Sequence, residues 1–263
     1  MSDAHVSSVR LSDGAIVKLE YHKELSSTSA LAKKYANAGY PDRYAILTEK
    51  QLSSPITGTK LAEGEGEHGV FVSVILRPAF FPSQAGLLGP LSAVALLNAL
   101  EAHTDKALGL GWISNVYCRG MHVGGVTMEA KLNSFSSYEY LIVNFAVRLD
   151  EKSFPPRLAD MVRQVFEPDN ASVSVIIAKT ILSKFFKAYS QVRTPEKYMD
   201  IYKRRFLLMD KRIYILRDGK KRPCRVVDLD KTSCALTVEE RGGARTVITS
   251  PSTVLIPKKI RVD

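Results

Sequence analysis

The chain has 263 residues, 45% of them hydrophobic and 24% charged, which excludes wholesale disorder and allows a sizeable buried core. Three cysteines at no metal-ligand spacing favour reduced thiols over a disulfide framework. The formal net charge of +10 is concentrated in residues 203–263, which hold 16 Lys and Arg against 7 Asp and Glu. This asymmetry predicts a basic C-terminal unit attached to a nearly neutral one.

Targeting signals are not visible in the pattern. The first residues lack the apolar run of a secretory signal. The richest apolar stretch, LLGPLSAVALLNAL, is short and interrupted by Gly and Pro, so we expect no membrane span. A cytoplasmic location is therefore expected. The basic unit fits either a solvated surface or attraction to an acidic partner; no nucleic-acid-binding signature accompanies it, so RNA stays in reserve.

The predicted elements alternate between strands and helices along most of the chain. In order, they are strand 17–25, helix 26–39, strand 44–51, strand 70–78, helix 85–103, strands 109–117, 121–132 and 138–149, and helix 172–189. After residue 208 the pattern changes to four short strands separated by DG, DK and GG turns. These turns predict a small antiparallel β barrel at the C-terminus.

Familiar catalytic and metal-binding motifs give little. The segment GEGEHG (64–69) matches the letters of a dinucleotide-binding loop, but it precedes a strand instead of opening a helix. The five histidines form no HExxH pattern and no pair with cysteine, so no metal site is predicted. A GxSxG nucleophile motif is also missing.

The segment 109–129 gathers the single tryptophan, Trp112, and the glycine pair Gly124-Gly125 around a turn. A flat indole can lie along an apolar or adenine ring, and glycine lets the backbone approach a ligand closely. Taken alone, however, the residues favour a simpler interpretation, in which Trp112 anchors the core and the glycines mark a bulge.

The order of elements resembles that of biotin protein ligases in the biotin/lipoate ligase superfamily, over nearly the whole chain. Ser26-Ser27-Thr28-Ser29 is similar to the family's D-S-T-N segment, and Gln51 to the glutamine before its glycine/arginine loop. Residues 111–115 (GWISN) resemble K-W-P-N-D, residues 122–129 (HVGGVTME) resemble K-x-x-G-I-L-x-E, and residues 142–144 (IVN) resemble G-I-N. The resemblance implies an α+β fold: a catalytic domain over 1–208, with a mixed sheet and flanking helices, followed by an SH3-like barrel over 209–263.

The resemblance also implies a reaction. The chain is expected to activate biotin with ATP and Mg²⁺ as biotinyl-adenylate and to transfer it to a lysine of a biotin carboxyl carrier domain of a carboxylase. Repressor-type members carry an N-terminal winged helix for which the sequence has little room, so no DNA partner is expected; a homodimer is possible. The implied site residues fall into three groups: Ser27, Thr28, Gln51, Trp112, Gly124 and Gly125 for the acid, Asn115 and Asn144 for the nucleotide, and Lys60 and His122 for catalysis.

Several cationic residues of the family pattern are replaced. The loop at 53–60 (SSPITGTK) offers Pro55 and Thr57 where arginines are expected, and only Lys60 is basic. Gly111 and His122 each stand where the family has lysine. Adenylate formation needs positive charge on developing oxygen anions. An alternative is therefore a catalytically degenerate homologue that acts as a ligand- or protein-binding module; a lipoate or octanoate transferase is a third possibility.

Overall fold

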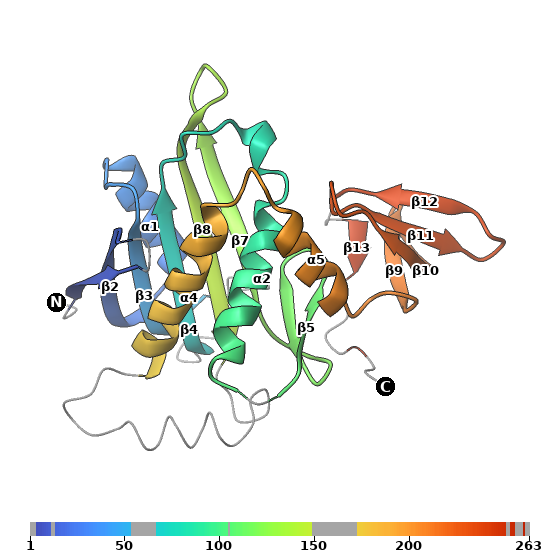
Figure 1. Cartoon of the computed structure of the whole chain (residues 1–263), viewed down its shortest axis with the longest axis horizontal. Helices are drawn as coiled ribbons and strands as arrows, with labels where there is room; N and C mark the ends of the chain where they lie inside the picture. Colours follow the sequence, from blue (N-terminus) through green and yellow to red (C-terminus); the bar gives the residue numbers. More distant parts are fainter. Residues whose placement is uncertain are drawn as a thin grey trace.

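The computed structural model describes residues 4–11, 14–53, 67–104, 106–148, 173–250, 253–255 and 260, and structural statements below refer to these residues. They form two sheets with helices packed on the larger one (Figure 1). The larger sheet has the strand order β1-β2-β3-β4-β8-β7-β6-β5. Its pairs are antiparallel except β2–β3, which is parallel, so the predicted mixed sheet is confirmed.

The helices and strands of this sheet are as follows. The strands are β1 (His5–Arg10), β2 (Ile16–Leu25), β3 (Tyr44–Gln51), β4 (Glu67–Leu76), β5 (Leu108–Gly111), β6 (Asn115–Cys118), β7 (Met121–Leu132) and β8 (Tyr138–Arg148). The helices are α1 (Thr28–Asn37), the short 3-10 helix η1 (Pro82–Ala85), α2 (Leu88–Glu101), α4 (Val173–Tyr189) and α5 (Glu196–Arg205). The sequence missed β1 and α5, and it predicted β5 and β6 as one strand.

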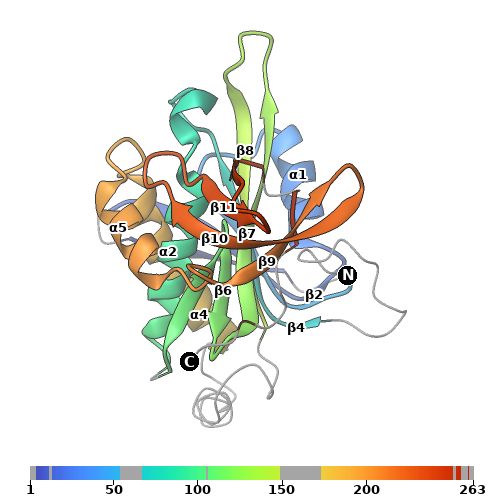
Figure 2. The same ribbon diagram turned by 90° about the vertical axis from the view of Figure 1, so that its right-hand side faces the viewer.

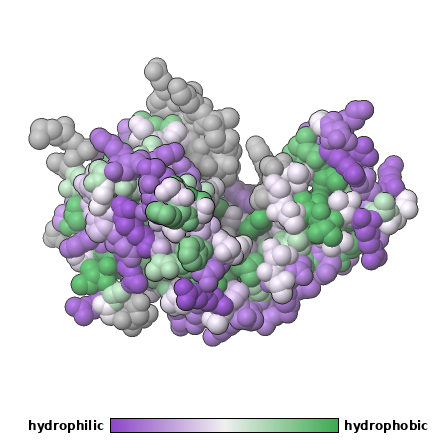
Figure 3. Space-filling view, turned by 90° about the horizontal axis from the view of Figure 1, so that it is seen from above, coloured by the Kyte–Doolittle hydropathy of each residue, from purple (hydrophilic) through white to green (hydrophobic). Residues whose placement is uncertain are grey.

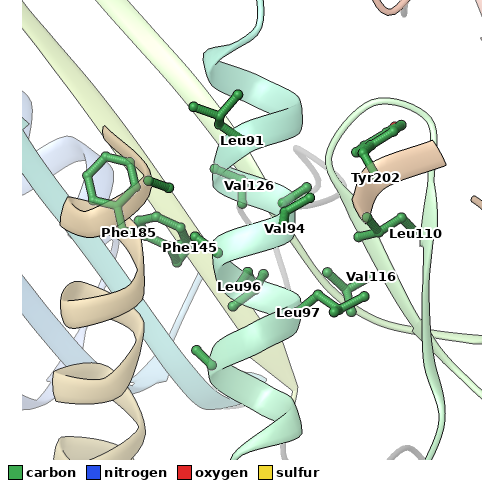
Figure 4. Close-up of a cluster of buried hydrophobic side chains, with 14 of the residues drawn as sticks. Leu91, Val94, Leu96, Leu97, Leu110, Val116, Val126, Phe145, Phe185 and Tyr202 are labelled. Carbon is green, nitrogen blue, oxygen red and sulfur yellow. The ribbon is translucent and has the colours of Figure 1, made fainter. Parts of the chain in front are cut away.

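Helices α2 and α4 cover one face of the larger sheet. This face presents alternate apolar side chains, among them Val126 and Phe145, to the helices (Figure 4). The rings of Phe145 and Phe185 on α4 lie 5.2 Å apart in an edge-to-face arrangement. Strands β4 and β8 also carry apolar residues on their opposite face, where they contact α1.

The apolar composition of α2 has the same explanation. Together with η1 it is long and apolar enough to cross a membrane by length and composition, over Pro82–Glu101. However, 61% of that window is buried inside the protein, where α2 contacts α4, α5 and several strands. A core helix passes the same test, so this segment is weak support for a membrane span.

Helix α1 packs on the opposite face of the sheet but covers only part of it. Ala32 and Ala36 on α1 lie against Ile46, Ile75 and Ile142, which belong to β3, β4 and β8. Alanine brings the helix close to the strands because it has a single methyl group. The rest of this face, beyond the N-terminus of α1, carries the polar residues described below.

The C-terminal residues form a second, antiparallel sheet with the order β12-β11-β10-β9-β13. Its strands are β9 (Arg212–Arg217), β10 (Lys220–Leu229), β11 (Leu236–Glu240), β12 (Arg245–Ile248) and β13 (Val254–Leu255). The sheet lies at the β5–β6 end of the molecule (Figures 1 and 2). Seen from above, a hollow separates this sheet from the main body, and apolar residues of the C-terminal sheet line one side of the hollow (Figure 3). The separate antiparallel unit is confirmed; an SH3-like barrel stays a prediction.

Candidate functional site

On the face of the larger sheet where α1 packs, the part that α1 does not cover carries a stripe of polar and small side chains, which we call the polar stripe. Directly paired residues of neighbouring strands point to the same side of a sheet. The register therefore aligns Ser73, Asn144 and Thr127 in one row across β4, β8 and β7. A second row runs across the same face through Phe71, Ala146, Gly125 and Asn115.

A buried hydrogen-bonded cluster closes one end of the polar stripe. Gln51 Oε1 accepts from the backbone N–H of Thr28 at 3.0 Å and lies 3.2 Å from its hydroxyl. Ser73 Oγ donates to Thr28 Oγ1 at 2.8 Å. All three side chains are buried. The structure thus brings together Thr28 and Gln51, as the sequence predicts, and adds Ser73, which the sequence did not single out within an apolar strand.

Ser27 lies beside this cluster but has a different task. It is the N-cap of α1, with extended backbone, and its hydroxyl accepts from the N–H of Ala30 at 3.2 Å. Ser and Thr are favoured at this position because the first N–H groups of a helix have no partner within the helix. The Ser27 hydroxyl oxygen therefore caps the helix, and its predicted role in acid binding stays a prediction.

Asn144 occupies the middle of the polar stripe. Its amide nitrogen lies 3.3 Å from the Thr127 hydroxyl, the residue opposite on β7. Asn144 is only 5% exposed, and its Oδ1 has no hydrogen-bond partner among the described residues. A buried acceptor without a partner is costly, so an oxygen of this kind at the centre of a polar stripe indicates a ligand position.

The other end of the stripe holds Asn115 and His122. His122 Nε2 lies 2.9 Å from Asn115 Oδ1, and Asn115 Nδ2 donates to the Trp112 carbonyl at 3.1 Å. Burial and the nearby Arg148 guanidinium lower the pKa of His122 to about 4. The imidazole is consequently neutral at pH 7, so it can donate or accept a hydrogen bond but supplies no positive charge.

The glycine pair is divided between the two faces of β7. Gly125 lies in the polar stripe, where a Cβ would come 3.1 Å from the Ser114 carbonyl oxygen. Gly124 points to the opposite face, and a Cβ there would come within 2.6 Å of the Ala146 carbonyl oxygen. The missing side chain at Gly124 therefore serves the close approach of β7 and β8, and the structure does not bring this residue into the stripe.

Trp112 points away from the stripe and into the core. It is fully buried, and its indole N–H donates to the Cys234 carbonyl in the C-terminal sheet at 2.6 Å. Tyr202 on α5 holds the turn between β5 and β6, since its hydroxyl lies within 3.0 Å of the Gly111 and Ile113 carbonyl oxygens. This turn is why the predicted strand 109–117 is two strands. Trp112 is the core anchor that the residues alone favoured.

Gly111, which replaces a lysine of the family pattern, faces the ring of Tyr117. A Cβ at position 111 would come 2.6 Å from Tyr117 Cε2, and Tyr117 itself is fully buried. The Tyr117 ring also packs edge-to-face on His122, with centroids 5.3 Å apart. Gly111 and His122, which stand at the two positions where the family has lysine, therefore both contact the ring of Tyr117.

Three further observations concern the site and its surroundings. The remaining predicted catalytic residue, Lys60, lies outside the described residues, as does most of its loop. Arg148, which the sequence did not single out, ends β8 on the same face as Asn144 and Ala146. A hollow of about 240 Å³ lies on the C-terminal sheet, lined among others by Arg212, Arg225 and Glu239, and contains none of the predicted site residues.

The larger sheet, its helices and the separate C-terminal sheet together define the fold of the biotin protein ligases. The biotin protein ligase of Aquifex aeolicus in complex with biotin and ATP has a TM-score of 0.65 to this chain at 18% identity, covering 89% of this chain and 96% of that one. The Helicobacter pylori biotin acetyl coenzyme A carboxylase synthetase has a TM-score of 0.54 at 15% identity, covering 87% and 98%. No protein-family model matches the chain.

Sequence comparison gives the same result. The bifunctional ligase/repressor BirA of Bacillus subtilis (strain 168) is 23% identical over 179 residues, which are 67% of this chain and 55% of BirA. The chain thus spans about half the length of the curated relatives it matches. A biotin protein ligase-like protein of unknown function from Silicibacter sp. shares the fold as well, with a TM-score of 0.58 at 13% identity over 89% of this chain and 94% of that one. The predicted resemblance to biotin protein ligases is confirmed.

Proposed function

We propose that the chain is an ATP-dependent biotin protein ligase. In the first step a biotin carboxylate oxygen attacks the α-phosphorus of ATP, and the bond to the β-phosphate breaks, which releases pyrophosphate. In the second step a lysine amine of a carboxylase carrier domain attacks the acyl carbon; AMP leaves and the amine loses a proton. The observation that carries the proposal is the buried, unpartnered Oδ1 of Asn144 at the centre of the polar stripe, on a fold shared with ligases that bind biotin and ATP.

In this proposal the polar stripe binds the acid along its length. Thr28, Ser73 and Asn144 offer hydroxyl and amide groups to a polar head group, because a buried polar ligand must find its hydrogen bonds in the protein. Asn144, which the resemblance assigns to the nucleotide, is here proposed for the acid because it lies directly opposite Ser73. Asn115 and the neutral His122 lie at the other end, next to the reacting carboxylate, where they orient it by hydrogen bonds. Lys60 stays a proposed source of positive charge from the neighbouring loop.

Mg²⁺ enters the proposal with the nucleotide. The described residues contain no group of three or more His, Cys, Asp or Glu side chains that could hold a metal ion. The polar stripe instead offers amides and hydroxyls. We therefore assign Mg²⁺ to the phosphates of ATP and derive no step from a metal held by the protein.

The test uses the full chain with biotin, MgATP and a carrier domain. We expect pyrophosphate release that depends on biotin and a biotin label on the carrier. Binding of biotin that ATP neither strengthens nor consumes, with no pyrophosphate released, would contradict the ligase and leave a binding module. If the carrier domain is modified with octanoate but not with biotin, the substrate of the proposal is wrong, whereas the type of reaction stands.

A pair of variants tests the role of Asn144. Asn144→Leu removes the unpartnered oxygen and is expected to weaken biotin binding by about tenfold or more, since the ligand loses its buried partner. The melting temperature should not fall, because a buried unsatisfied acceptor disappears. Asn98→Leu is the control. Asn98 is half-buried on α2, which packs on the face of the sheet opposite the polar stripe, so the biotin affinity measured by calorimetry should not change.

A further inference from the structure

Any acid or nucleotide that binds the polar stripe brings negative charge, and the stripe needs a cation to receive it. Two lysines of the family pattern are replaced by Gly111 and His122, and the imidazole of His122 is neutral at pH 7. On β7, Glu129 lies two residues from Thr127 on the same face and is engaged by Ser29 and Lys33 of α1, so it supplies no positive charge. The strongest candidate for this cation is at the end of β8.

Strand β8 arranges three different side chains along the polar stripe. Because alternate residues point to one face, Asn144, Ala146 and Arg148 follow one another on the uncovered side. Asn144 and Arg148 are four residues apart, which is about 13 Å along an extended strand. Ala146, which lies between the Asn144 amide and the Arg148 guanidinium along the strand, contributes only a methyl group.

The neighbours of Arg148 leave its side chain next to the stripe. Gly69, its direct cross-strand partner on β4, contributes no side chain at this place. Arg148 is half-buried, where the attraction between a guanidinium and an anion is less screened than on an open surface. It is also near enough to His122 to act on the charge state of the imidazole.

We propose that Arg148 binds the anionic end of the ligand, whether the carboxylate of the acid or the phosphate to which it becomes joined. A guanidinium suits either group because its planar fork matches two oxygens at once. Arg148 thereby takes the place of the family's missing lysines, from a different strand. The identity of the ligand rests on the proposed function, whereas the anion site itself does not.

The experiment compares Arg148→Gln with the unchanged chain by calorimetry, using biotin, the neutral biotinamide and inorganic pyrophosphate as separate probes. We expect Arg148→Gln to weaken biotin binding by about tenfold to a hundredfold and to leave biotinamide binding unchanged. Arg148→Lys should recover part of the loss, since it keeps the charge but not the fork. Arg119→Gln, an exposed arginine in the turn between β6 and β7, is the control and should change none of the three affinities.

The outcomes separate the anion site from the proposed function. A loss for pyrophosphate alone would support the site and assign it to phosphate. If the unchanged chain binds no biotin but binds pyrophosphate through Arg148, the anion site stands and the ligase does not. Equal losses for biotin and biotinamide, no loss for any probe, or no binding by the unchanged chain would overturn the inference.

A measurement without ligand provides a second check. Removal of the guanidinium should raise the pKa of His122, which can be followed by NMR titration of the imidazole in Arg148→Gln. An unchanged His122 titration would contradict the assigned proximity.

Discussion

Gly111 shows how a single residue in the site is decided by its neighbour. Gly111→Ala would place a Cβ 2.6 Å from the buried ring of Tyr117, which cannot move without disturbing His122. We expect this substitution to lower the free energy of unfolding by about 1–3 kcal/mol, measured by urea denaturation. Gly86→Ala is the matched control, because its backbone has φ −55° and a Cβ there meets nothing within 4 Å. A Gly111→Ala loss no larger than that of Gly86→Ala would contradict the packing argument.

The neutral imidazole of His122 predicts a dependence of stability on pH. Its pKa of about 4 in the folded chain is below the ordinary value of 6.5, so the unfolded chain binds the proton more strongly. Stability is therefore retained above pH 6.5 and lost as the pH falls towards 4, by up to about 1.4 kcal/mol per pH unit.

Urea denaturation at pH 7 and pH 5 measures this effect. His122→Gln should show a smaller loss than the unchanged chain, since it keeps a hydrogen-bonding group but does not titrate. The comparison is needed because burial also lowers the pKa of His103, which both proteins share. Parallel losses in the two proteins would show that His122 titrates normally.

At the scale of elements, the start of α1 fixes the geometry of the polar stripe. Ser27 is the N-cap of α1, and Thr28 is the first residue of the helix. The backbone N–H and the hydroxyl of Thr28 both contact Gln51 on β3. The same helix buries Ala32 and Ala36 against the sheet. A substitution at the cap is therefore expected to shift the first turn of α1 and, with it, Thr28 in the polar stripe.

We expect Ser27→Ala to lower the free energy of unfolding by about 1 kcal/mol, since one N–H of the first turn loses its acceptor. Ser27→Asp should retain the stability because its carboxylate caps equally well. Ser26→Ala, at an exposed neighbouring position, is the control. Chemical denaturation of the three variants makes the comparison, and a loss in Ser26→Ala as large as in Ser27→Ala would argue against the cap.

At the scale of the whole molecule, one apolar core joins the two sheets. Trp112, Tyr202 and Leu110 at the β5 end belong to the same buried cluster as Leu229 and Cys234 of the C-terminal unit. The indole N–H of Trp112 bonds across this junction, and Lys203 on α5 lies 3.2 Å from Asp228. The predicted division at 208/209 therefore passes through a shared core, although the charge changes sharply there.

This continuity predicts a single unfolding transition. Trp112 is the only tryptophan, so its fluorescence reports on the junction, whereas far-UV circular dichroism reports on the secondary structure of the whole chain. We expect the two urea curves to coincide. A fluorescence change at lower urea than the dichroism change would show that the C-terminal sheet separates first.

The sequence by itself determined the order and type of most elements and the resemblance to biotin protein ligases. These follow from local periodicity, capping and motif order, which are properties of short segments. It did not identify Ser73 or Arg148, because their neighbours come from strands that are distant in the chain.

Only the tertiary structure decided which way the residues of the motifs face. Adjacent glycines point to opposite sides of β7, so Gly125 joins the stripe while Gly124 packs against β8. The Trp112 ring is buried in the core, and burial leaves His122 uncharged. Alternation along a strand is written in the sequence, but strand register, the choice of face and the loss of water around a side chain arise only when distant segments pack together.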